Sequence, residues 1–382
     1  MSLKICAVTG SRADWGLLSS VLARLRDDPG FTLQIIVTGQ HLTPQAGRTS
    51  SVIEEEGFSI DFSADMGIDD RDDPASLTRA MGRGMIALAD GLERLNPDLM
   101  LIAGDRYEIL GAAQAALMAR VPIAHLYGGD VTEGAIDELI RHALTKLSHL
   151  HFVTNEPAAR RVIQMGEDPA QVYCVGSPAL DHIHDLKTLD RTVFFQRIGM
   201  VPRRFNGLVT FHPVTQETDS LSQCQEMLAA LESMGPETGW ILTGSNADPQ
   251  GQQISALLKD FARGYENALF VNSLGTSLYL NALRHVDVVV GNSSSGLYEA
   301  PSFGTPTVNI GTRQKGRLKA PSVVDCLPER EAIGTAIHTA IPLKGQFFEN
   351  PYGDGYSASR IVNHIKGLKD PRSLCKKVFH NL

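Results

Sequence analysis

The segment VDVVVGNSSSGLYE, residues 286–299, carries the pattern that decides the fold. It opens with a valine-rich run, which is typical of a strand buried in a parallel sheet. A small polar turn follows, and a short helix is expected to start at Leu297. Two interpretations fit the turn equally well. It is either an ordinary turn capped by a serine, or an anion site in which Ser293, Ser294 and Ser295 join free helix N–H groups around a diphosphate.

Polar side chains after this turn fit the same two interpretations. Glu299 lies one turn into the expected helix, where its carboxylate can accept hydrogen bonds from a ribose. Arg313, with Lys315 and Arg317, follows the next apolar run. These cations either clamp a phosphate or are solvated loop charges.

Strand and helix patterns alternate along the whole chain. The predicted strands are 4–9, 31–37, 99–103, 122–126, 151–154, 172–175, 207–211, 240–243, 268–271, 286–290 and 307–310. The predicted helices include 17–26, 77–95, 136–150 and 357–368, and the acidic segment 61–76 is expected to be a solvated loop. The fold class is therefore α/β, with two Rossmann-like, doubly wound parallel sheets.

The two series of strands suggest two domains. We expect an N-terminal Rossmann-like domain over residues 1–180 that carries the catalytic carboxylates, and a C-terminal Rossmann-like domain over 181–356 that binds the nucleotide. The last helical segment, within 357–382, is expected to pack back on the first domain. Two facing domains would bring their polar strand ends together across a cleft.

The helix predicted at 136–150 is strongly amphipathic. Its expected buried stripe consists of Ile136, Leu139, Ile140, Ala143, Leu147 and Leu150. Asp137, Glu138 and Arg141 fall off that stripe, near the start of the helix.

Bulk composition excludes several classes of protein. The 382 residues carry a net charge of −8, which argues against a nucleic-acid or anionic-membrane partner. The five cysteines are scattered, as in a reduced cytosolic protein rather than a disulfide scaffold. Arg12 and Asp14 interrupt any signal-peptide core, and no apolar run reaches transmembrane length. We expect a soluble cytoplasmic protein.

Polar side chains gather where predicted strands end. In open α/β sheets ligands bind at the carboxyl ends of the strands, so this placement predicts a binding site. The residues concerned are Arg12, Gln40, His41, Asp105, Arg106, Asp130, His212, Asn246, Asp248 and the turn at 291–296.

Each of these positions also has a structural interpretation. Asp105 and Arg106 form either a catalytic carboxylate beside a cation or a helix cap with a local ion pair. His212 is either a phosphate donor and proton shuttle or a satisfied structural histidine. The pairs His149/His151 and His182/His184 have metal-like spacing, but no third ligand is nearby, so no metal is expected. Neither a GxGxxG nor a P-loop motif occurs, so no nicotinamide cofactor is expected.

Several segments together resemble the UDP-N-acetylglucosamine 2-epimerases, in particular the hydrolysing branch that serves sialic-acid-type sugar synthesis. They are GSRADWG (10–16), GDRYEIL (104–110), HLYGGDVTEGAIDELIRHALTKLSHLHF (125–152), HPVT (212–215), GNSSSG (291–296), GTPTVNIGTRQKGR (304–317) and YGDG (352–355). The central 28-residue segment is the most specific of them. The Arg-Ala-Asp-Trp-Gly form near the N-terminus resembles the hydrolysing branch, whereas non-hydrolysing epimerases usually carry Arg-Pro-Glu.

The resemblance implies a glycosyltransferase-B-like fold and a UDP-sugar substrate, with no cofactor. It implies catalytic roles for Asp105, Asp137 and His212, diphosphate contacts from the serines at 293–295, and ribose contact from Glu299. It also implies phosphate contacts from Arg12 and Arg313, and positions near the sugar for His41 with its neighbour Gln40, Asn246 and Asp248. A homo-oligomer, either a dimer or a tetramer, is expected from family habit.

One position departs from the family pattern. Many relatives carry His-x-Glu-Gly-Gly where this chain has His125-Leu126-Tyr127-Gly128-Gly129. A glutamate with a reported acid or base role is thus a tyrosine here, and Asp130 or Glu138, with Arg106 in support, are candidates to replace it.

The chemistry explains why such groups are needed. The C2–H of a 2-acetamido sugar is not acidic, so a base can remove it only as the C1–O bond to the diphosphate breaks. The resulting glycal is then hydrated to the free 2-epimer. Alternative functions are a non-hydrolysing epimerase, a glycosyltransferase on the same fold, and a non-catalytic nucleotide-sugar sensor. The sugar, and a UDP or GDP carrier, are left open.

Overall fold

The computed structural model describes residues 2–43, 49–68, 73–132, 136–214, 219–245 and 250–382. The chain divides into two compact units. Unit 1 comprises Met1–His182 together with Tyr352–Leu382, and unit 2 comprises Ile183–Pro351. Unit 2 is thus inserted between the two chain segments that build unit 1.

Unit 1 contains a parallel sheet of seven strands among the described residues, in the order β3-β2-β1-β4-β5-β6-β7. The strands are β1 (Leu3–Thr9), β2 (Phe31–Thr38), β3 (Phe62–Ala64), β4 (Leu99–Ala103), β5 (Ile123–Leu126), β6 (Leu150–Val153) and β7 (Val172–Cys174). The strand order reverses direction between β1 and β4, and this edge is where α/β sheets bind ligands.

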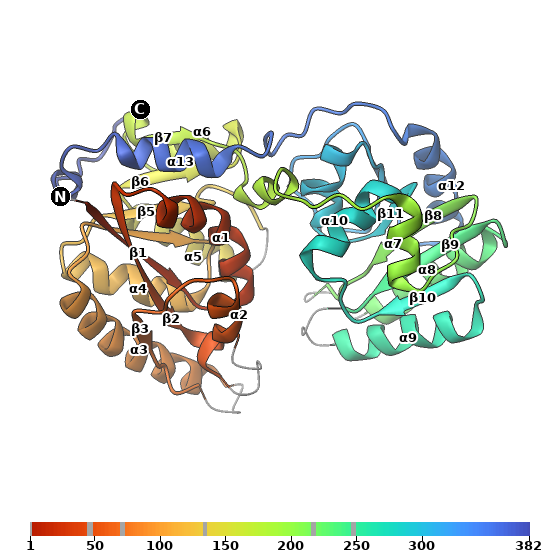
Figure 1. Cartoon of the computed structure of the whole chain (residues 1–382), viewed down its shortest axis with the longest axis horizontal. Helices are drawn as coiled ribbons and strands as arrows, with labels where there is room; N and C mark the ends of the chain where they lie inside the picture. The colour runs from red at the N-terminus through yellow and green to blue at the C-terminus, as the bar shows by residue number, and fades with distance from the viewer. Residues whose placement is uncertain (1, 44–48, 69–72, 133–135, 215–218, 246–249) are drawn as a thin grey trace. The chain divides into compact units, whose positions relative to one another are not determined.

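Helices cover both faces of this sheet (Figure 1). They are α1 (Arg12–Asp27), α2 (Ser50–Glu55), α3 (Pro74–Leu95), α4 (Tyr107–Met118), α5 (Ile136–Leu147), α6 (Glu156–Gln164) and α13 (Ser357–Lys366). Helices α3, α4 and α5 pack on the face that carries Cys6, Val8 and Met100. Every residue of β4 is buried, so the other face is covered too, and α1 and α13 lie side by side in the same unit.

Unit 2 repeats this architecture with six strands in its described part, in the order β10-β9-β8-β11-β12-β13. The strands are β8 (Phe205–Thr210), β9 (Thr238–Thr243), β10 (Ala268–Val271), β11 (Val288–Gly291), β12 (Thr307–Ile310) and β13 (Val323–Cys326). The helices are α7 (Arg191–Ile198), α8 (Ser220–Ser233), α9 (Gly251–Gly264), α10 (Gly275–His285), α11 (Ser295–Tyr298) and α12 (Arg330–Ala340).

Alternation along the strands of unit 2 separates its two cores. Val209, Leu242 and Val290 pack with α8, α9 and α12, whereas Leu208 and Val289 pack with α7 and α10 on the other face. The strand order reverses between β8 and β11, so the turn after Val290 lies at the ligand-binding edge of this sheet.

The predicted fold class is confirmed, and several local predictions are wrong. The segment 61–76, expected to be a loop, contains β3 and the start of α3. Strand β13 and helix α7 were not predicted, and the strand expected from Val286 begins at Val288. Exposed polar residues interrupt these short elements, which hides their periodicity.

The stripe predicted for α5 is also wrong. Ile136 and Leu139 are each 72% exposed, and Leu150 belongs to β6 rather than to the helix. The buried positions of α5 are Ile140, Arg141, Leu144 and Thr145. The helix is therefore rotated so that a charged side chain, Arg141, faces inward.

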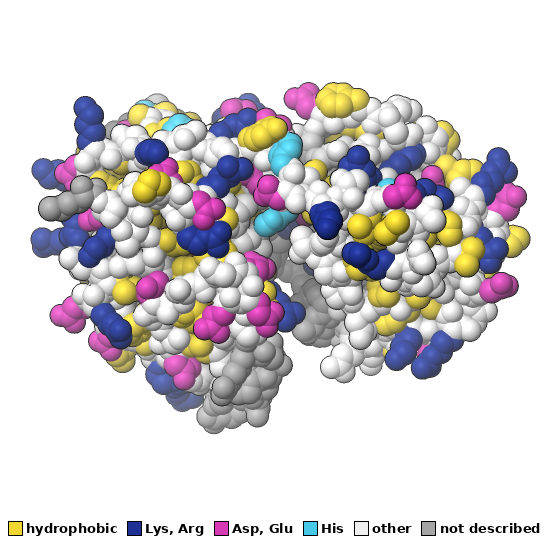
Figure 2. All heavy atoms as spheres, in the orientation of Figure 1, with side chains coloured by type: hydrophobic (Ala, Val, Ile, Leu, Met, Phe, Trp, Pro, Cys, Tyr) yellow, Lys and Arg dark blue, Asp and Glu magenta, His cyan; other side chains and the backbone are white. Residues whose placement is uncertain are grey.

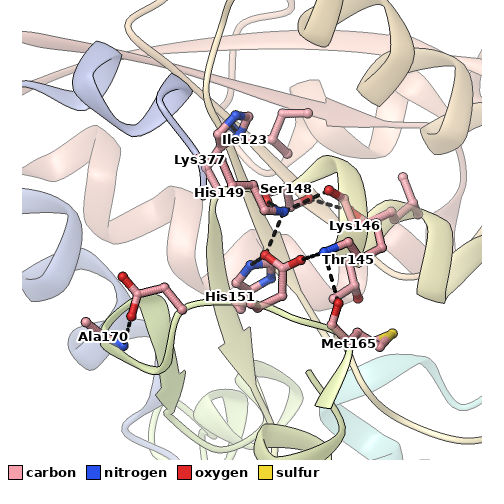
Figure 3. A network of polar contacts seen from close by, with 12 residues as sticks. Ile123, Thr145, Lys146, Ser148, His149, His151, Met165, Ala170 and Lys377 are labelled. Atoms are coloured by element: carbon pink, nitrogen blue, oxygen red, sulfur yellow. Dashed lines mark hydrogen bonds and ion pairs between the residues drawn. The ribbon is translucent and has the colours of Figure 1, made fainter. Parts of the chain in front are cut away.

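The C-terminal tail is fastened to unit 1 by a buried carboxylate (Figure 3). Glu167 accepts hydrogen bonds from Lys146 Nζ at 2.6 Å and from His151 Nε2 at 2.9 Å, and it pairs with Lys377 Nζ at 2.6 Å. Lys377 also donates to the carbonyl oxygens of Lys146 and Ser148.

The surface carries side chains of both charge signs. In Figure 2 acidic and basic side chains are interspersed over the visible face of each unit. Among the residues that the structure describes, no helix is both long and apolar enough to span a membrane.

Candidate active site

An ion pair anchors the carboxylate that follows β4. Asp105 begins the loop at the point where the sheet of unit 1 reverses its strand order, and Arg141 Nη2 of α5 donates to Asp105 Oδ2. Arg141 is 5% exposed and also donates to the Asp130 carbonyl oxygen at 2.8 Å and to Thr132 Oγ1 at 3.0 Å. One buried guanidinium therefore holds both strand-end loops.

Asp137 lies in the first turn of α5, within electrostatic reach of Asp105. Burial and the negative charge of Asp105 raise the pKa of Asp137, while Arg106 and Arg141 oppose this rise. Two carboxylates and two guanidinium groups are thus brought together at this edge. Such an arrangement tunes a carboxylate for proton transfer.

Two other carboxylates predicted as acid–base candidates make contacts at Asp130 and Thr132, in the described residues after β5. Glu138 Oε2 accepts from the backbone N–H of Thr132 at 2.6 Å. Asp130 accepts from Thr154 Oγ1 at 3.0 Å and from Asn155 Nδ2 at 3.3 Å. Their observed contacts shape the backbone around Asp105 and Asp137.

Tyr127, the residue that replaces the family's glutamate, is directed into the protein. It is 7% exposed, and its backbone adopts φ +66°, which is uncommon for a residue with a side chain. Its hydroxyl forms a 2.8 Å hydrogen bond with Ser177 Oγ and accepts from Ala179 N at 3.3 Å. The tyrosine thus supports the chain segment that leads out of unit 1.

The N-terminal candidates lie at the ends of β1 and β2. Arg12 is exposed at the first residue of α1, and Gln40 is exposed after β2. His41 is fully buried, with Nε2 3.0 Å from Thr9 Oγ1 and Nδ1 2.7 Å from Thr49 Oγ1. Burial lowers the pKa of His41 to about 4. A neutral histidine with both nitrogens bonded to threonines fixes these two loops.

In unit 2, His212 and Asn292 link the two loops at the point of strand reversal. The backbone N–H of His212 donates to Asn292 Oδ1, and Asn292 Nδ2 donates to the carbonyl oxygen of His212, both at 2.8 Å. The carbonyl oxygen of Asn292 accepts from Arg313 Nη1 at 3.2 Å and from Gln314 Nε2 at 2.8 Å. Asn292 thus bonds both His212 and Arg313 and holds them next to the serine turn.

The serine turn leads into a helix of only four residues, α11. Ser294 precedes it without a side-chain capping bond, whereas Ser293 Oγ accepts from the backbone N–H of Ser295 at 3.4 Å. A helix this short contributes little dipole, so any anion contact would rely on local N–H groups and hydroxyls. Burial raises the pKa of Glu299 to about 7, and the nearby Ser295 hydroxyl opposes that rise.

Two predicted residues, Asn246 and Asp248, lie outside the described residues. Within the described residues, no group of three or more metal-ligating side chains occurs. His149 Nδ1 accepts from the N–H of Ile123, and His151 bonds Glu167, so both belong to the structural network of unit 1.

Sequence reasoning missed two residues that organise these sites, Arg141 and Asn292. Arg141 was placed off the buried stripe of its helix. A buried arginine facing a carboxylate disrupts the apolar periodicity. The apolar stripe of the sequence therefore predicted the wrong buried face for this helix. Asn292 stands inside the quoted turn, but its amide pairs with a residue 80 positions earlier, and no local pattern reveals such a contact.

Comparison with known proteins decides the family. Residues 23–366 match the family model described as UDP-N-acetylglucosamine 2-epimerase. The chain belongs to this family. It is 36% identical over 369 residues to the UDP-N,N'-diacetylbacillosamine 2-epimerase (hydrolyzing) of Legionella pneumophila, covering 96% of this chain and 97% of that protein. It is 37% identical over 324 residues to the GDP/UDP-N,N'-diacetylbacillosamine 2-epimerase (hydrolyzing) of Campylobacter jejuni, covering 84% of each.

Solved structures agree on the fold of this 2-epimerase family member. The UDP-GlcNAc 2-epimerase from Neisseria meningitidis, solved with UDP-GlcNAc bound, superposes with a TM-score of 0.78 at 18% identity, covering 95% of this chain and 99% of that one. The match to the family model and the two relatives confirm the family resemblance inferred from the central segment.

Proposed function

We propose that this chain is a hydrolysing nucleotide-sugar 2-epimerase that converts a UDP-linked 2-acetamido sugar and water into UDP and the free 2-epimer. The observation that carries the proposal is the ion pair of Arg141 with Asp105, whose negative charge acts on the nearby Asp137 and raises its pKa. Two similar proteins named as hydrolysing 2-epimerases support it over the other members of the family.

The proposed reaction has two steps. One carboxylate, Asp105 or Asp137, takes the C2 proton as the C1–O bond breaks, which gives a glycal and UDP. The second carboxylic acid then delivers a proton to C2 from the opposite face while water adds at C1. Burial and the negative charge of Asp105 raise the pKa of Asp137, which favours a proton on Asp137.

We assign the leaving UDP to unit 2. Ser293, Ser294 and Ser295 would donate to the diphosphate, and Glu299 would accept from the ribose. Arg313 and His212, both tied to Asn292, would stabilise the departing charge. In unit 1 Arg12 is the proposed phosphate contact. The proposed sugar contacts are Gln40, Asn246 and Asp248, and His41 would support them from beneath.

The proposed substrate is a 2,4-diacetamido-trideoxy sugar carried by UDP. Two relatives at 36% and 37% identity are named for N,N'-diacetylbacillosamine, whereas a Neisseria meningitidis protein named UDP-N-acetylglucosamine 2-epimerase is 33% identical. UDP-N-acetylglucosamine is the second candidate, and a GDP carrier is the third.

We also propose a homo-oligomer, a dimer or tetramer, and a cytoplasmic location. Helices α3, α4 and α5 lie side by side and expose Ile86 and Met118 in addition to Ile136 and Leu139. Exposed apolar side chains of this size favour association. Light scattering of the purified chain tests this, and a monomer at micromolar concentration would contradict it.

The decisive experiment incubates the purified chain with each of the three nucleotide sugars in D₂O. The expected products are UDP and a free sugar with deuterium at C2, detected by NMR. An intact epimerised nucleotide sugar would favour the non-hydrolysing reaction. Transfer to an added acceptor would favour a glycosyltransferase, and UDP binding without turnover would favour a sensor.

A further inference from the structure

Two carboxyl groups that no step above uses lie beside Arg106. Glu108 is in the first turn of α4, with a fully buried side chain, and Asp14 is in the first turn of α1, 2% exposed. Their helices follow β4 and β1, the strands between which the sheet order reverses. This is the edge that carries Asp105, so both carboxyls lie under the candidate active site.

Glu108 holds Arg106 at two points. Arg106 Nε donates to Glu108 Oε2 at 3.2 Å, and Nη2 donates to Oε1 at 3.1 Å. A two-point ion pair fixes the plane of the guanidinium as well as its position. The side chain of Arg106 is 31% exposed, so its outer edge reaches the surface of the sheet edge while its inner edge is held.

The backbone encloses Glu108 closely. Gly39, at φ +57°, packs so tightly that an added Cβ would lie 2.7 Å from Glu108 Cγ. A Cβ at Gly10 would lie 3.0 Å from Glu108 Cβ. The turns after β1 and β2 are thus built around this carboxylate, and its position is determined by the fold rather than by a mobile surface rotamer.

Asp14, Glu108 and Arg106 form a group with two carboxyl groups but only one positive charge. Asp14 lies near Glu108 in α4 and near Arg106, which precedes that helix. Its Oδ2 accepts from the N–H of Gly10 at 3.1 Å, and the Ser11 hydroxyl is also close. The nearby His41, which bonds Thr9 of β1, is neutral. Burial and the negative charge of Glu108 raise the pKa of Asp14 to about 7, against the opposing effects of Arg106, Gly10 and Ser11. With one guanidinium for two carboxyls, the group is neutral only when Asp14 holds a proton.

This group connects to the reacting carboxylates through Arg106. After burial and Asp105, the charges that act on the pKa of Asp137 are those of Arg106 and Arg141, which lower it, and Glu108, which raises it. A change at Glu108 therefore alters the pKa of Asp137 in two ways: directly through its charge, and indirectly through the orientation of Arg106.

We propose that Glu108 and Asp14 are positioning residues of this active site. Glu108 fixes Arg106 through the two-point ion pair, and the proton on Asp14 keeps the group neutral, so that Arg106 sets the electrostatic environment of Asp137. The inference rests on the proposed function, because its main readout is the release of free sugar.

The kinetic test compares Glu108→Gln and Asp14→Asn with the control Asp181→Asn. Asp181 is an equally buried carboxylate that accepts from Ser357 N and Ala358 N at the start of α13. We expect Glu108→Gln to lower kcat by about tenfold or more with little change in KM, and to move the acid limb of the kcat profile to lower pH, since a neighbouring negative charge is lost. Glu108→Asp, which keeps the charge but shortens the arm, should restore the acid limb and not kcat.

Asp14→Asn mimics the protonated form. We expect it to match the wild type below about pH 7 and to remove the fall in kcat that ionisation of Asp14 causes above that pH. Asp181→Asn should leave both limbs in place. Wild-type kcat profiles in both Glu108→Gln and Asp14→Asn, or the same profile change in Asp181→Asn, would overturn the proposal.

A second readout needs no activity. An acid whose pKa is raised in the folded state loses stabilisation as pH rises from its unfolded pKa, about 4, to its folded value. The melting temperature of Asp14→Asn minus that of the wild type should therefore increase between pH 4 and pH 7. A constant difference would refute the proton on Asp14. A wild-type chain that releases no free sugar would instead refute the proposed function, and the melting curves would still decide whether the buried pair exists.

Discussion

Asn292 and His212 are joined by two hydrogen bonds of 2.8 Å, one in each direction between the asparagine amide and the histidine backbone. The pair ties the end of β8 to the end of β11, the two strands between which unit 2 reverses its strand order. The same asparagine receives Arg313 and Gln314 on its carbonyl oxygen. Its side-chain amide holds His212 and its backbone carbonyl oxygen holds Arg313, so one residue positions two of the proposed UDP contacts.

Asn292→Ala should lower both stability and UDP affinity. Loss of two buried hydrogen bonds costs about 1–3 kcal/mol. The backbone of His212 is then no longer tied to residue 292, whose backbone carbonyl oxygen still receives Arg313. Asn281→Ala is the matched control, since Asn281 is also fully buried and bonds the backbone of Leu189 and Ser277 elsewhere in unit 2. Calorimetric titration with UDP below the melting temperature should separate them. Equal UDP affinities in the two variants would contradict the assignment.

Asp105→Asn and Asp137→Asn should each lower kcat by at least ~10², because each would remove a proton-transfer group. Asp98→Asn is a suitable control, since Asp98 accepts from Lys4 N outside the candidate site. Release of UDP in a coupled assay measures the effect. Full activity in either variant removes that residue from the mechanism.

His212→Asn should also lower kcat by about 10², with the fold retained through Asn292, which bonds only the backbone of residue 212. The expected defect lies in departure of the diphosphate. A substrate with a better leaving group should therefore regain more activity in this variant than in Asp137→Asn. Equal recovery in the two would argue against a leaving-group role for His212.

The acid limb of kcat should reflect Asp137. With Asp137 as the base of the first step, it must be ionised. Burial and Asp105 raise its pKa above the ordinary value, so activity should fall with decreasing pH through a pKa above about 4. Arg141→Lys keeps the positive charge but cannot reproduce the contacts to Asp130 and Thr132. It should lower kcat while leaving the limb within about half a unit. A large shift of the limb would show that the placement of the guanidinium, and not its positive charge alone, sets the pKa of Asp137.

The carboxylate that fastens the C-terminal tail predicts a second pH effect, on stability. Burial alone would raise the pKa of Glu167, but hydrogen bonds from His151, Lys146 and Lys377 outweigh it and lower the pKa to about 2. A carboxyl group whose pKa is lowered in the folded state stabilises the fold at pH values above its unfolded pKa, about 4. This contribution is lost as the pH falls toward 2. Lys377→Met should lower the free energy of unfolding at pH 7 by about 1–3 kcal/mol and reduce the loss on acidification. Urea unfolding at pH 7 and pH 3 checks both, and a parallel drop at the two pH values would contradict the account.

The sequence predicted what depends on local pattern. Valine-rich runs were enough for the two parallel sheets, and the ends of those runs placed Asp105 and His212 after β4 and β8. Contacts that require distant parts of the chain were not predictable in this way. The ion pair of Arg141 with Asp105 spans 36 positions and reverses the expected orientation of a helix. The buried group of Asp14 and Glu108 depends on two turns that meet only in the folded sheet.

Short, partly exposed elements were the other source of error. Strand β3 has three residues, only one of which is buried, so it reads as part of an acidic loop. Strand β13 has no fully buried residue and lies at the edge of its sheet. Periodicity cannot identify a strand when half of the signal, the apolar face, is missing.

The insertion of Ile183–Pro351 into unit 1 has a consequence for how the protein is made. Unit 2 is continuous, so a ribosome can release all of its residues before the chain is complete. The first part of unit 1 precedes unit 2, whereas α13 and Lys377, which pairs with Glu167, are made only after unit 2. During synthesis the sheet of unit 1 therefore cannot be completed until α13 has been made. Until then the surface that α13 covers is accessible to chaperones, whereas unit 2 can already have folded.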